Sequence, residues 1–269
     1  MIAKTVELKN GKVSIIENGG LRAHVYSTND ALDDQVIIIE RPSESGNGGR
    51  AVVIELPCFK NSIDEMTRYI NDNGIQVEGK LVSYHAAGES FLPDVKAYMT
   101  ESAHKYNTVG GGKQLITNFT GIFGEAFDPS IVEDGERISA GPITIAGVDL
   151  VINPDADAYE IEIPAMSAVY IHMLGHDCHS IVAGPGHADA TVKKLQSYLD
   201  RGFRLFLSSH YGPENTDDVK TKIAYIEDLK TIASASSSAE EFKAAVGKKY
   251  PDYSGENYLA MTAGFFFPQ

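Results

Sequence analysis

The sequence contains no tryptophan and only two cysteines, Cys58 and Cys178, among 269 residues. Two thiols so far apart in the chain do not form the dense framework of a disulfide-stabilised secreted domain. No segment approaches the roughly 20 consecutive apolar residues of a membrane span, and the first nine residues lack the apolar stretch of a signal peptide. We therefore expect reduced thiols in a soluble cytoplasmic protein that makes no membrane contact.

Basic residues are also scarce, since 23 lysines and arginines face 37 aspartates and glutamates and give a formal net charge of −14. The summed field of such a chain repels nucleic acid and anionic membrane surfaces. We expect a small-molecule substrate or ligand as the partner, and no nucleic acid. A hydrophobic content of 43% over this length is enough for one large core.

The first half of the chain is predicted to be rich in β-structure. Residues 4–17 alternate around the turn Asn10-Gly11, and residues 21–27 form another alternating run. Residues 36–40 and 51–55 are continuous apolar runs, which are typical of strands buried on both faces. After them we predict a helix capped by Ser62, strands over 80–84 and 95–99, an irregular stretch over 107–141, and a loop at Gly110–Lys113, which lacks the spacing of a phosphate-binding loop.

The second half repeats the order of strands followed by helices. The predicted elements are strands over 143–145, 148–152, 159–163, 169–171 and 203–207, a helix over 188–200, a helix capped by Thr216 that ends near residue 234, and a helix over 239–248. The chain closes with an aromatic segment, Phe265-Phe266-Phe267-Pro268. We expect this tail to pack on the core or on a partner, because exposed aromatic clusters mark interaction surfaces. A homodimer is one arrangement that would cover it.

Three of the predicted strands end at a histidine. His85 follows strand 80–84, His172 follows strand 169–171, and His210 lies just beyond strand 203–207. One histidine at a strand end is usually a hydrogen-bonded structural residue. Three such positions, each opening a polar segment that contains glycine, predict one shared site.

The order of these parts resembles that of the metallo-β-lactamase superfamily over nearly the whole chain. Residues 52–57 with the following helix match the end of the family's N-terminal meander, and the segment 208–212 stands where the family has its final histidine. The resemblance implies an α/β (α+β) fold, a four-layer αββα sandwich in which two mixed β-sheets are flanked by helices. It implies one domain over 1–269, with pseudo-halves at 1–140 and 141–235 and a C-terminal helix and tail over 236–269.

The family's H-x-H-x-D-H signature aligns here with a segment that retains only part of it. His85 falls on its first histidine and Glu89 on its aspartate, whereas Ala87 and Ser90 replace the other two histidines. No histidine occurs over 153–157, where the family has its middle one, and His172 stands where the family has its bridging aspartate. His210 matches the final histidine. The resemblance thus implies a degenerate signature and a rearranged, mononuclear metal site.

A transition metal in a catalytic site needs three or four nitrogen, oxygen or sulfur ligands and one open position for water. His85, His172 and His210 are the predicted ligands, and Glu89 is a fourth ligand or a general base, so His85 and Glu89 are the candidate catalytic residues. Zinc is the expected metal, with iron or manganese as alternatives. The neighbouring residues His176, Asp177 and His179 form an alternative metal-binding cluster.

Two functions follow from these residues. The first is a metal-dependent hydrolase that acts on an ester, amide, thioester or phosphoester. The second is a metal-free, catalytically inactive member of the same fold that binds a small molecule or a partner chain in the same cleft. The convergence of the three histidines discriminates between them, because imidazoles buried without a ligand or a hydrogen bond are energetically costly.

Overall fold

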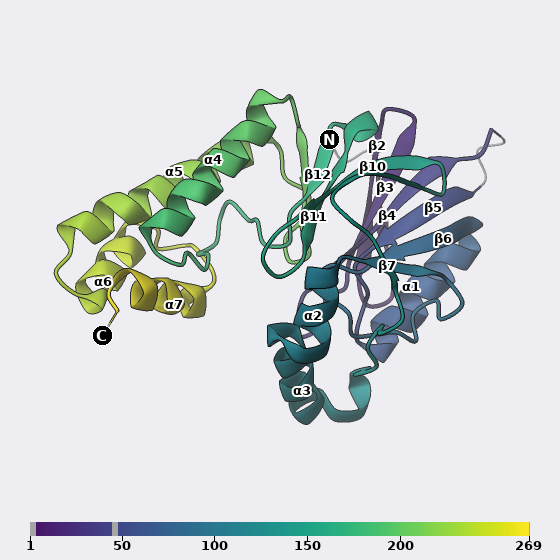
Figure 1. Ribbon diagram of the computed structural model, residues 1–269, viewed down its shortest axis with the longest axis horizontal. Coiled ribbons are helices and arrows are strands. Elements are labelled where there is room, and N and C mark those ends of the chain that lie inside the picture. Colours follow the sequence, from purple (N-terminus) through teal and green to yellow (C-terminus); the bar gives the residue numbers. More distant parts are fainter. Residues whose placement is uncertain (1–3, 45–47, 269) are drawn as a thin grey trace. The chain divides into compact units, whose positions relative to one another are not determined.

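Two β-sheets run through residues 4–207 of the computed structural model, which describes residues 4–44 and 48–268 (Figure 1). The first sheet contains strands β1 to β8 in chain order. Its strands are β1 (Lys4–Glu7), β2 (Lys12–Asn18), β3 (Leu21–Ser27), β4 (Gln35–Pro42), β5 (Gly49–Ile54), β6 (Ile75–Leu81), β7 (Ala97–Met99) and β8 (Glu136–Arg137).

The first sheet changes from antiparallel to parallel pairing at β5. Strands β1 to β5 form an antiparallel meander, and the predicted hairpin at Asn10-Gly11 is present between β1 and β2. From β5 onward the pairings with β6, β7 and β8 are parallel, because the helix α1 (Lys60–Asp72) carries the chain back to the starting edge of β5. The parallel strands β5 and β6 therefore end at the same edge of the sheet.

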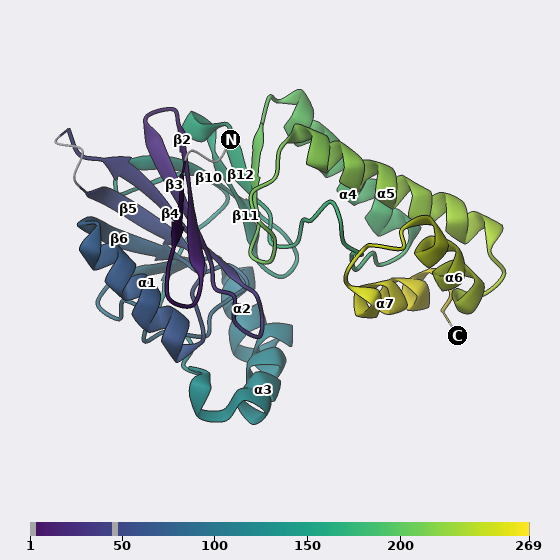
Figure 2. The same cartoon turned by 180° about the vertical axis from the view of Figure 1, so that it is seen from behind.

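Helix α1 covers one face of the first sheet, against which it buries Ile63, Met66, Tyr69 and Ile70 (Figure 2). The prediction that Ser62 caps this helix is wrong, because α1 begins at Lys60 with Phe59 at the N-cap. Ser62 lies inside the first turn, where its hydroxyl donates to Asp30 at 2.8 Å. The serine is used to hold a loop of the meander rather than the helix terminus.

The stretch 107–141, predicted to be irregular, contains the end of one helix and the whole of another. Helix α2 (Glu101–Val109) is capped by Thr100, and α3 (Gly111–Phe123) follows it directly. The glycines of the predicted loop Gly110–Lys113 form the start of α3, so that loop prediction is wrong. Glycine is a poor helix former, but Ile116, Phe119 and Phe123 recur at helical spacing. The rings of Phe119 and Phe123 both lie against Phe127, and this contact offsets the weak propensity.

The second sheet has the strand order β13-β12-β11-β10-β9. Its strands are β9 (Gly141–Ile145), β10 (Val148–Pro154), β11 (Tyr159–Ile163), β12 (Ala168–Tyr170) and β13 (Leu205–Leu207). Strand β11 is buried along its whole length, and Ser83 at the end of the first sheet donates to the carbonyl of Tyr159 at 2.7 Å. The predicted strands of this half are all present, and β13 is shorter than predicted.

The chain divides into two compact units. The first comprises residues 1–172 and 207–213, and the second comprises 173–206 and 214–269. The second unit is built from α4 (Pro185–Asp200), α5 (Thr216–Ala235), α6 (Ala239–Lys249) and α7 (Glu256–Phe266). The predicted cap Thr216 is wrong by one residue, because Asn215 is the N-cap and forms a capping box with Asp218.

The aromatic tail packs within its own unit. Phe266 ends α7 and Phe267 follows it, and both rings contact Phe242 of α6 with centroid distances of 5.6 and 5.8 Å. Phe265 is half exposed. The predicted packing of the tail on the core is thus present for two of its three phenylalanines.

The mixed α/β fold class with two sheets and flanking helices is confirmed. None of the helices in the described ranges 4–44 and 48–268 is long and apolar enough to cross a membrane.

Candidate metal centre

The three histidines predicted as ligands meet in the first unit, although the strand predicted over 80–84 ends at Leu81 in β6, four residues before His85. One ring nitrogen from each of His85, His172 and His210 lies within 4.8 Å of the others. The ring centroids are 5.1 Å apart for His85 and His172, 4.9 Å for His85 and His210, and 4.8 Å for His172 and His210. Within the part of the chain that the structure describes, no other histidine, cysteine or carboxylate residues form such a group.

Backbone contacts fix two of the histidines relative to each other. His172 lies two residues beyond β12, and its carbonyl accepts from the backbone N–H of Ser209 at 3.1 Å and from the hydroxyl of Ser208 at 2.8 Å. Ser209 immediately precedes His210. Because β12 and β13 are adjacent in the second sheet, the residues that follow these two strands emerge at neighbouring positions.

A buried carboxylate, Glu55, holds the backbone of His85. The backbone N–H groups of Tyr84 and His85 donate to it at 2.9 Å, and the hydroxyl of Tyr170 donates to it at 2.5 Å. Glu55 itself directly follows β5, is fully buried and has a φ of 63°, in the left-handed region. This conformation is uncommon for a residue other than glycine, and the hydrogen bonds to the carboxylate stabilise it.

A second buried carboxylate, Asp34, contacts two of the histidines. Its Oδ1 lies 3.2 Å from His210 Nδ1, and its Oδ2 lies 3.9 Å from His85 Nδ1. Burial alone would raise the pKa of Asp34, but His85, His210 and the thiol of Cys58 outweigh that effect and lower it. Asp34 is therefore an ionised carboxylate beside the histidine cluster.

The third ring, His172, is held by an aromatic neighbour. Tyr84 stacks on it with a centroid distance of 4.0 Å and an interplanar angle of 12°, and the Tyr84 hydroxyl donates to Asp155 at 2.8 Å. Burial, followed by the proximity of His85 and His210, lowers the pKa of His172 well below the usual 6.5. His172 is thus a neutral imidazole, which is the protonation state that binds a metal.

The spacing of the three nitrogens approaches that of a metal site. Two histidine nitrogens bound to one tetrahedral ion at about 2.1 Å each are roughly 3.4 Å apart. The three ring nitrogens lie within 4.8 Å of one another, so the rings would rotate inward to bind one ion. In addition, the Nδ1 atom of His172 is buried and has no hydrogen-bond partner. The donor set of three imidazoles therefore fits one transition-metal ion.

The other predicted site residues lie outside this group. Glu89 is exposed on the segment that follows His85, and its backbone N–H donates to the carbonyl of Ser130 at 3.3 Å. In the second unit, His176 pairs with Glu214 at 2.8 Å, and the buried His179 contacts the hydroxyl of Tyr225 at 2.9 Å. Asp177, the remaining residue of the predicted alternative cluster, lies between these two histidines in the chain. The structure does not bring His176, Asp177 and His179 together as a ligand group in the ranges it describes.

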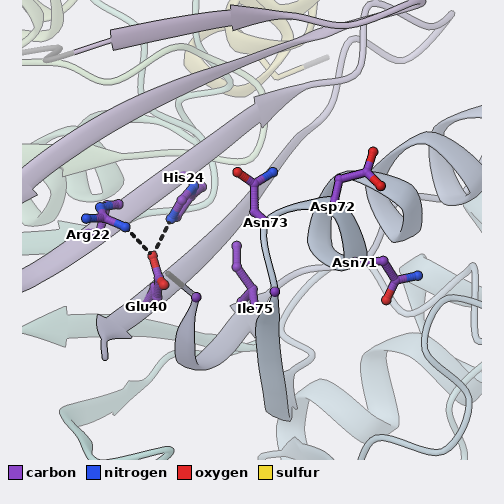
Figure 3. Close-up of a pocket in the computed structure, with 9 residues that line it drawn as sticks. Arg22, His24, Glu40, Asn71, Asp72, Asn73 and Ile75 are labelled. Carbon is purple, nitrogen blue, oxygen red and sulfur yellow. Dashed lines mark hydrogen bonds and ion pairs between the residues drawn. The ribbon is translucent and has the colours of Figure 1, made fainter. Parts of the chain in front are cut away.

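A cavity elsewhere in the first unit does not include the histidine cluster. It has a volume of about 410 Å³ and lies between β3, β4 and the end of α1 (Figure 3). Arg22 and His24 both bind the Oε2 atom of Glu40 at its wall, at 3.1 and 2.9 Å. Both contacts engage Oε2, and the Oε1 atom of Glu40 is buried without a hydrogen-bond partner. We assign no function to this cavity.

Glu55 and Asp34 were not recognised from the sequence. Glu55 ends the continuous apolar run 51–55, immediately before Leu56-Pro57. Because charged residues are rarely buried unless they are paired, a glutamate at the end of a buried strand is the signal that could have identified it. Asp34 closes a polar segment, 27–35, that has the composition of a turn. Nothing local distinguishes Asp34 from Asp30 or Asp33, since its role depends on segments that the fold brings together.

No protein-family model and no curated protein matches the sequence. Among solved structures, a metallo-beta-lactamase family protein from Thermus thermophilus is 12% identical, with a TM-score of 0.61 over 91% of this chain and 91% of that chain. A beta-lactamase domain protein from Burkholderia ambifaria is 13% identical, with a TM-score of 0.61 over 94% of this chain and 86% of that chain.

A stereoselective inverting sec-alkylsulfatase from Pseudomonas sp. is also similar. It is 15% identical, with a TM-score of 0.55, and the match covers 92% of this chain and 48% of that chain. This chain therefore spans about half the length of the sulfatase. Identities this low establish the fold alone. The chain has the metallo-β-lactamase fold, and the resemblance predicted from the sequence is confirmed at that level.

Proposed function

We propose that this protein is a metal-dependent hydrolase-like protein that binds one metal ion through His85, His172 and His210. Zinc is the favoured ion, and iron and manganese are the alternatives. The observation that carries the proposal is the convergence of three histidines, from three separate strand ends, to within 4.8 Å. Two of these rings, His85 and His172, have a buried Nδ1 atom without a hydrogen-bond partner. Burying such groups side by side is unfavourable, and a shared ion would account for the cluster.

The proposed site is mononuclear and differs from the family's signature. The segment that follows His85 supplies no second histidine, because Ala87 and Ser90 stand at those positions. His172 takes the place that the resemblance assigns to an aspartate. The three proposed ligands, His85, His172 and His210, are imidazoles that bind a metal in their neutral form. They do not compensate the charge of a divalent ion, so a carboxylate near the ion would stabilise it.

A bound divalent ion would supply a Lewis acid and lower the pKa of a coordinated water toward 7. The protein's own residues would hold and shape the site. Tyr84 covers one face of His172 and limits the approach of water from that side. Glu89, exposed four residues after His85, stays a predicted fourth ligand or general base. The expected substrate is a small molecule with an ester, amide, thioester or phosphoester bond.

Elemental analysis of the purified protein tests the proposal. The native protein should contain about one metal ion per chain, lost after chelator treatment and restored by Zn²⁺. The variants His85→Ala, His172→Ala and His210→Ala should each retain less than half of it. The matched control is His104→Ala, which removes a half-buried histidine from α2, outside the cluster.

Absence of metal after incubation with Zn²⁺, Fe²⁺ and Mn²⁺ would contradict the proposal. The metal-free alternative, a histidine-lined cleft that binds a small molecule or partner, would then hold. If metal is bound, hydrolysis of p-nitrophenyl acetate, thioacetate and phosphate by the Zn²⁺-loaded protein should depend on the three histidines and not on His104. This second measurement separates a catalytic site from a purely structural one.

A further inference from the structure

We propose that Asp34 is the positioning residue of the histidine cluster. Its carboxylate accepts the Nδ1 protons of His210 and His85, fixes both rings as Nδ1–H tautomers, and leaves their Nε2 lone pairs to point at a shared ligand. The proposal deepens the function proposed above, because it names the group that orients two of the three metal ligands and supplies the missing negative charge.

The contacts of Asp34 assign its two oxygens to different histidines. Oδ1 lies 3.2 Å from His210 Nδ1, and Oδ2 lies 3.9 Å from His85 Nδ1. Asp34 Oδ1 and His85 Nδ1 are both buried and have no hydrogen-bond partner, so small rotations of the two rings toward Asp34 would satisfy both atoms. A carboxylate that accepts the second ring N–H of a ligating histidine fixes its tautomer and raises its basicity.

Asp34 is more deeply buried than the two rings that it contacts. Only 3% of the residue is accessible, and Oδ1 is buried from solvent. By contrast, the side chains of His85 and His210 are 18% and 24% exposed. Because His85 Nδ1 is among the buried atoms, the exposed part of its ring lies away from Asp34.

The backbone and a thiol hold Asp34 in place. Its carbonyl accepts from the N–H of Thr28 at 3.0 Å, and the next residue, Gln35, donates its N–H to the carbonyl of Ser209 at 2.5 Å. Cys58 Sγ lies 3.8 Å from Asp34 Oδ2. Burial, with Asp34 nearby, raises the pKa of the Cys58 thiol, so the thiol stays protonated and donates to the carboxylate.

Nitrogen-15 NMR of the metal-free protein tests the tautomers directly. Long-range proton–nitrogen correlations, recorded on the neutral rings, should assign His85 and His210 as Nδ1–H tautomers. In Asp34→Asn, at least one of the two rings should shift toward the Nε2–H tautomer. The control Asp30→Asn removes a carboxylate from the same loop, one that binds Ser62 instead, and should leave both rings unchanged.

Titration with Co²⁺ alone supplies the second measurement. Asp34→Asn should bind Co²⁺ about 10–100-fold more weakly than the wild type, while Asp30→Asn binds it normally. At saturating Co²⁺ the visible spectrum of Asp34→Asn should keep the wild-type shape, because the ligands are unchanged. A spectrum with altered coordination would instead make Asp34 a ligand and overturn the positioning role.

The two proposals fail in distinguishable ways. If the wild type binds neither Co²⁺ nor Zn²⁺, the metal site is wrong, and the tautomers of the metal-free rings still decide the role of Asp34. Nε2–H tautomers in the wild type, or Nδ1–H tautomers that persist in Asp34→Asn, would overturn that role. Because the wild-type tautomers are themselves a test, the proposal can be refuted even if Asp34→Asn fails to fold.

Discussion

The hydroxyl of Tyr170 lies 2.5 Å from Glu55 Oε1 and 2.5 Å from Ser209 Oγ. Glu55 also accepts the backbone N–H of His85, and Ser209 directly precedes His210. One buried tyrosine thus links the segments that carry two of the three histidines. It stands on β12, two residues before the third histidine, His172.

Replacing this hydroxyl should weaken both the fold and the site. We expect Tyr170→Phe to lower the free energy of unfolding by about 1–3 kcal/mol, because it leaves buried acceptors on Glu55 and Ser209 with fewer partners. Urea denaturation measures this change. Because the three segments lose a shared anchor, Co²⁺ affinity should fall in the same variant.

The matched control is Tyr26→Phe. Tyr26 is also fully buried, and its hydroxyl donates to a carboxylate, Glu65, at 3.0 Å. Its removal should cost a similar amount of stability and leave Co²⁺ affinity unchanged. Equal affinities in both tyrosine variants would show that the link through Tyr170 does not position the histidines.

The histidine cluster was predictable from the sequence because its signal is local. Each histidine follows a run that reads as a strand. His172 and His210 follow the neighbouring strands β12 and β13 of the second sheet, and His85 follows β6 of the first sheet. Glu55 was not predictable in this way, because its partners Tyr84 and Tyr170 lie 29 and 115 positions away in the chain. Asp34 likewise contacts His210. Asp34 directly precedes β4 of the first sheet, whereas His210 follows β13 of the second sheet. Only the three-dimensional pairing of the strands identifies these two carboxylates.

Helix starts were predicted less well than strands. The sequence offers Ser62 and Thr216 as caps, yet the caps are Phe59 and Asn215. Hydroxyl and amide side chains near a helix start are chemically equivalent candidates, and tertiary contacts decide among them. The bond between Ser62 and Asp30 is one such contact.

The cap of α5 gives a prediction that separates two neighbouring residues. The Asn215 side chain accepts from the backbone N–H groups of Asp217 and Asp218 at 2.7 and 3.4 Å. Asn215→Ala should lower the free energy of unfolding by about 1 kcal/mol, whereas Thr216→Ala should change it by less than about 0.5 kcal/mol. Thermal and urea unfolding measure both. A larger loss for Thr216→Ala would restore the cap predicted from the sequence.

Asp128 gives a prediction about acid stability. Burial would raise its pKa, but hydrogen bonds from Ser130 and Ser90, at 2.6 and 2.5 Å from their hydroxyls, outweigh burial and lower the pKa below 3.8. A carboxyl with a lowered folded-state pKa stabilises the fold above its unfolded pKa, and the contribution is lost as pH falls through the folded value.

The stability difference between the wild type and Asp128→Asn should therefore be constant above about pH 5 and shrink below about pH 4. Urea denaturation at a series of pH values measures it. The double variant Ser90→Ala with Ser130→Ala should retain the carboxyl but show a weaker pH dependence, because the two hydroxyl hydrogen bonds that lower the pKa are gone and only those from the backbone N–H groups of the two residues remain. A difference that is independent of pH would contradict the assignment.

Gly88 tests whether the segment after His85 must approach the segment after β5 closely. Gly88 has a φ of 87°, and a Cβ there would lie 2.1 Å from the carbonyl oxygen of Pro57. Gly88→Ala should lower the free energy of unfolding by well over about 1 kcal/mol and weaken Co²⁺ binding, because the segment that carries His85 must move.

The control is Gly20→Ala. Gly20 has a φ of 75°, but nothing lies within 4 Å of a Cβ added there. It should show only the cost of the left-handed backbone, about 1 kcal/mol, with normal Co²⁺ affinity. If both variants lose the same stability and bind Co²⁺ equally, the close approach to Pro57 does not hold His85 in place.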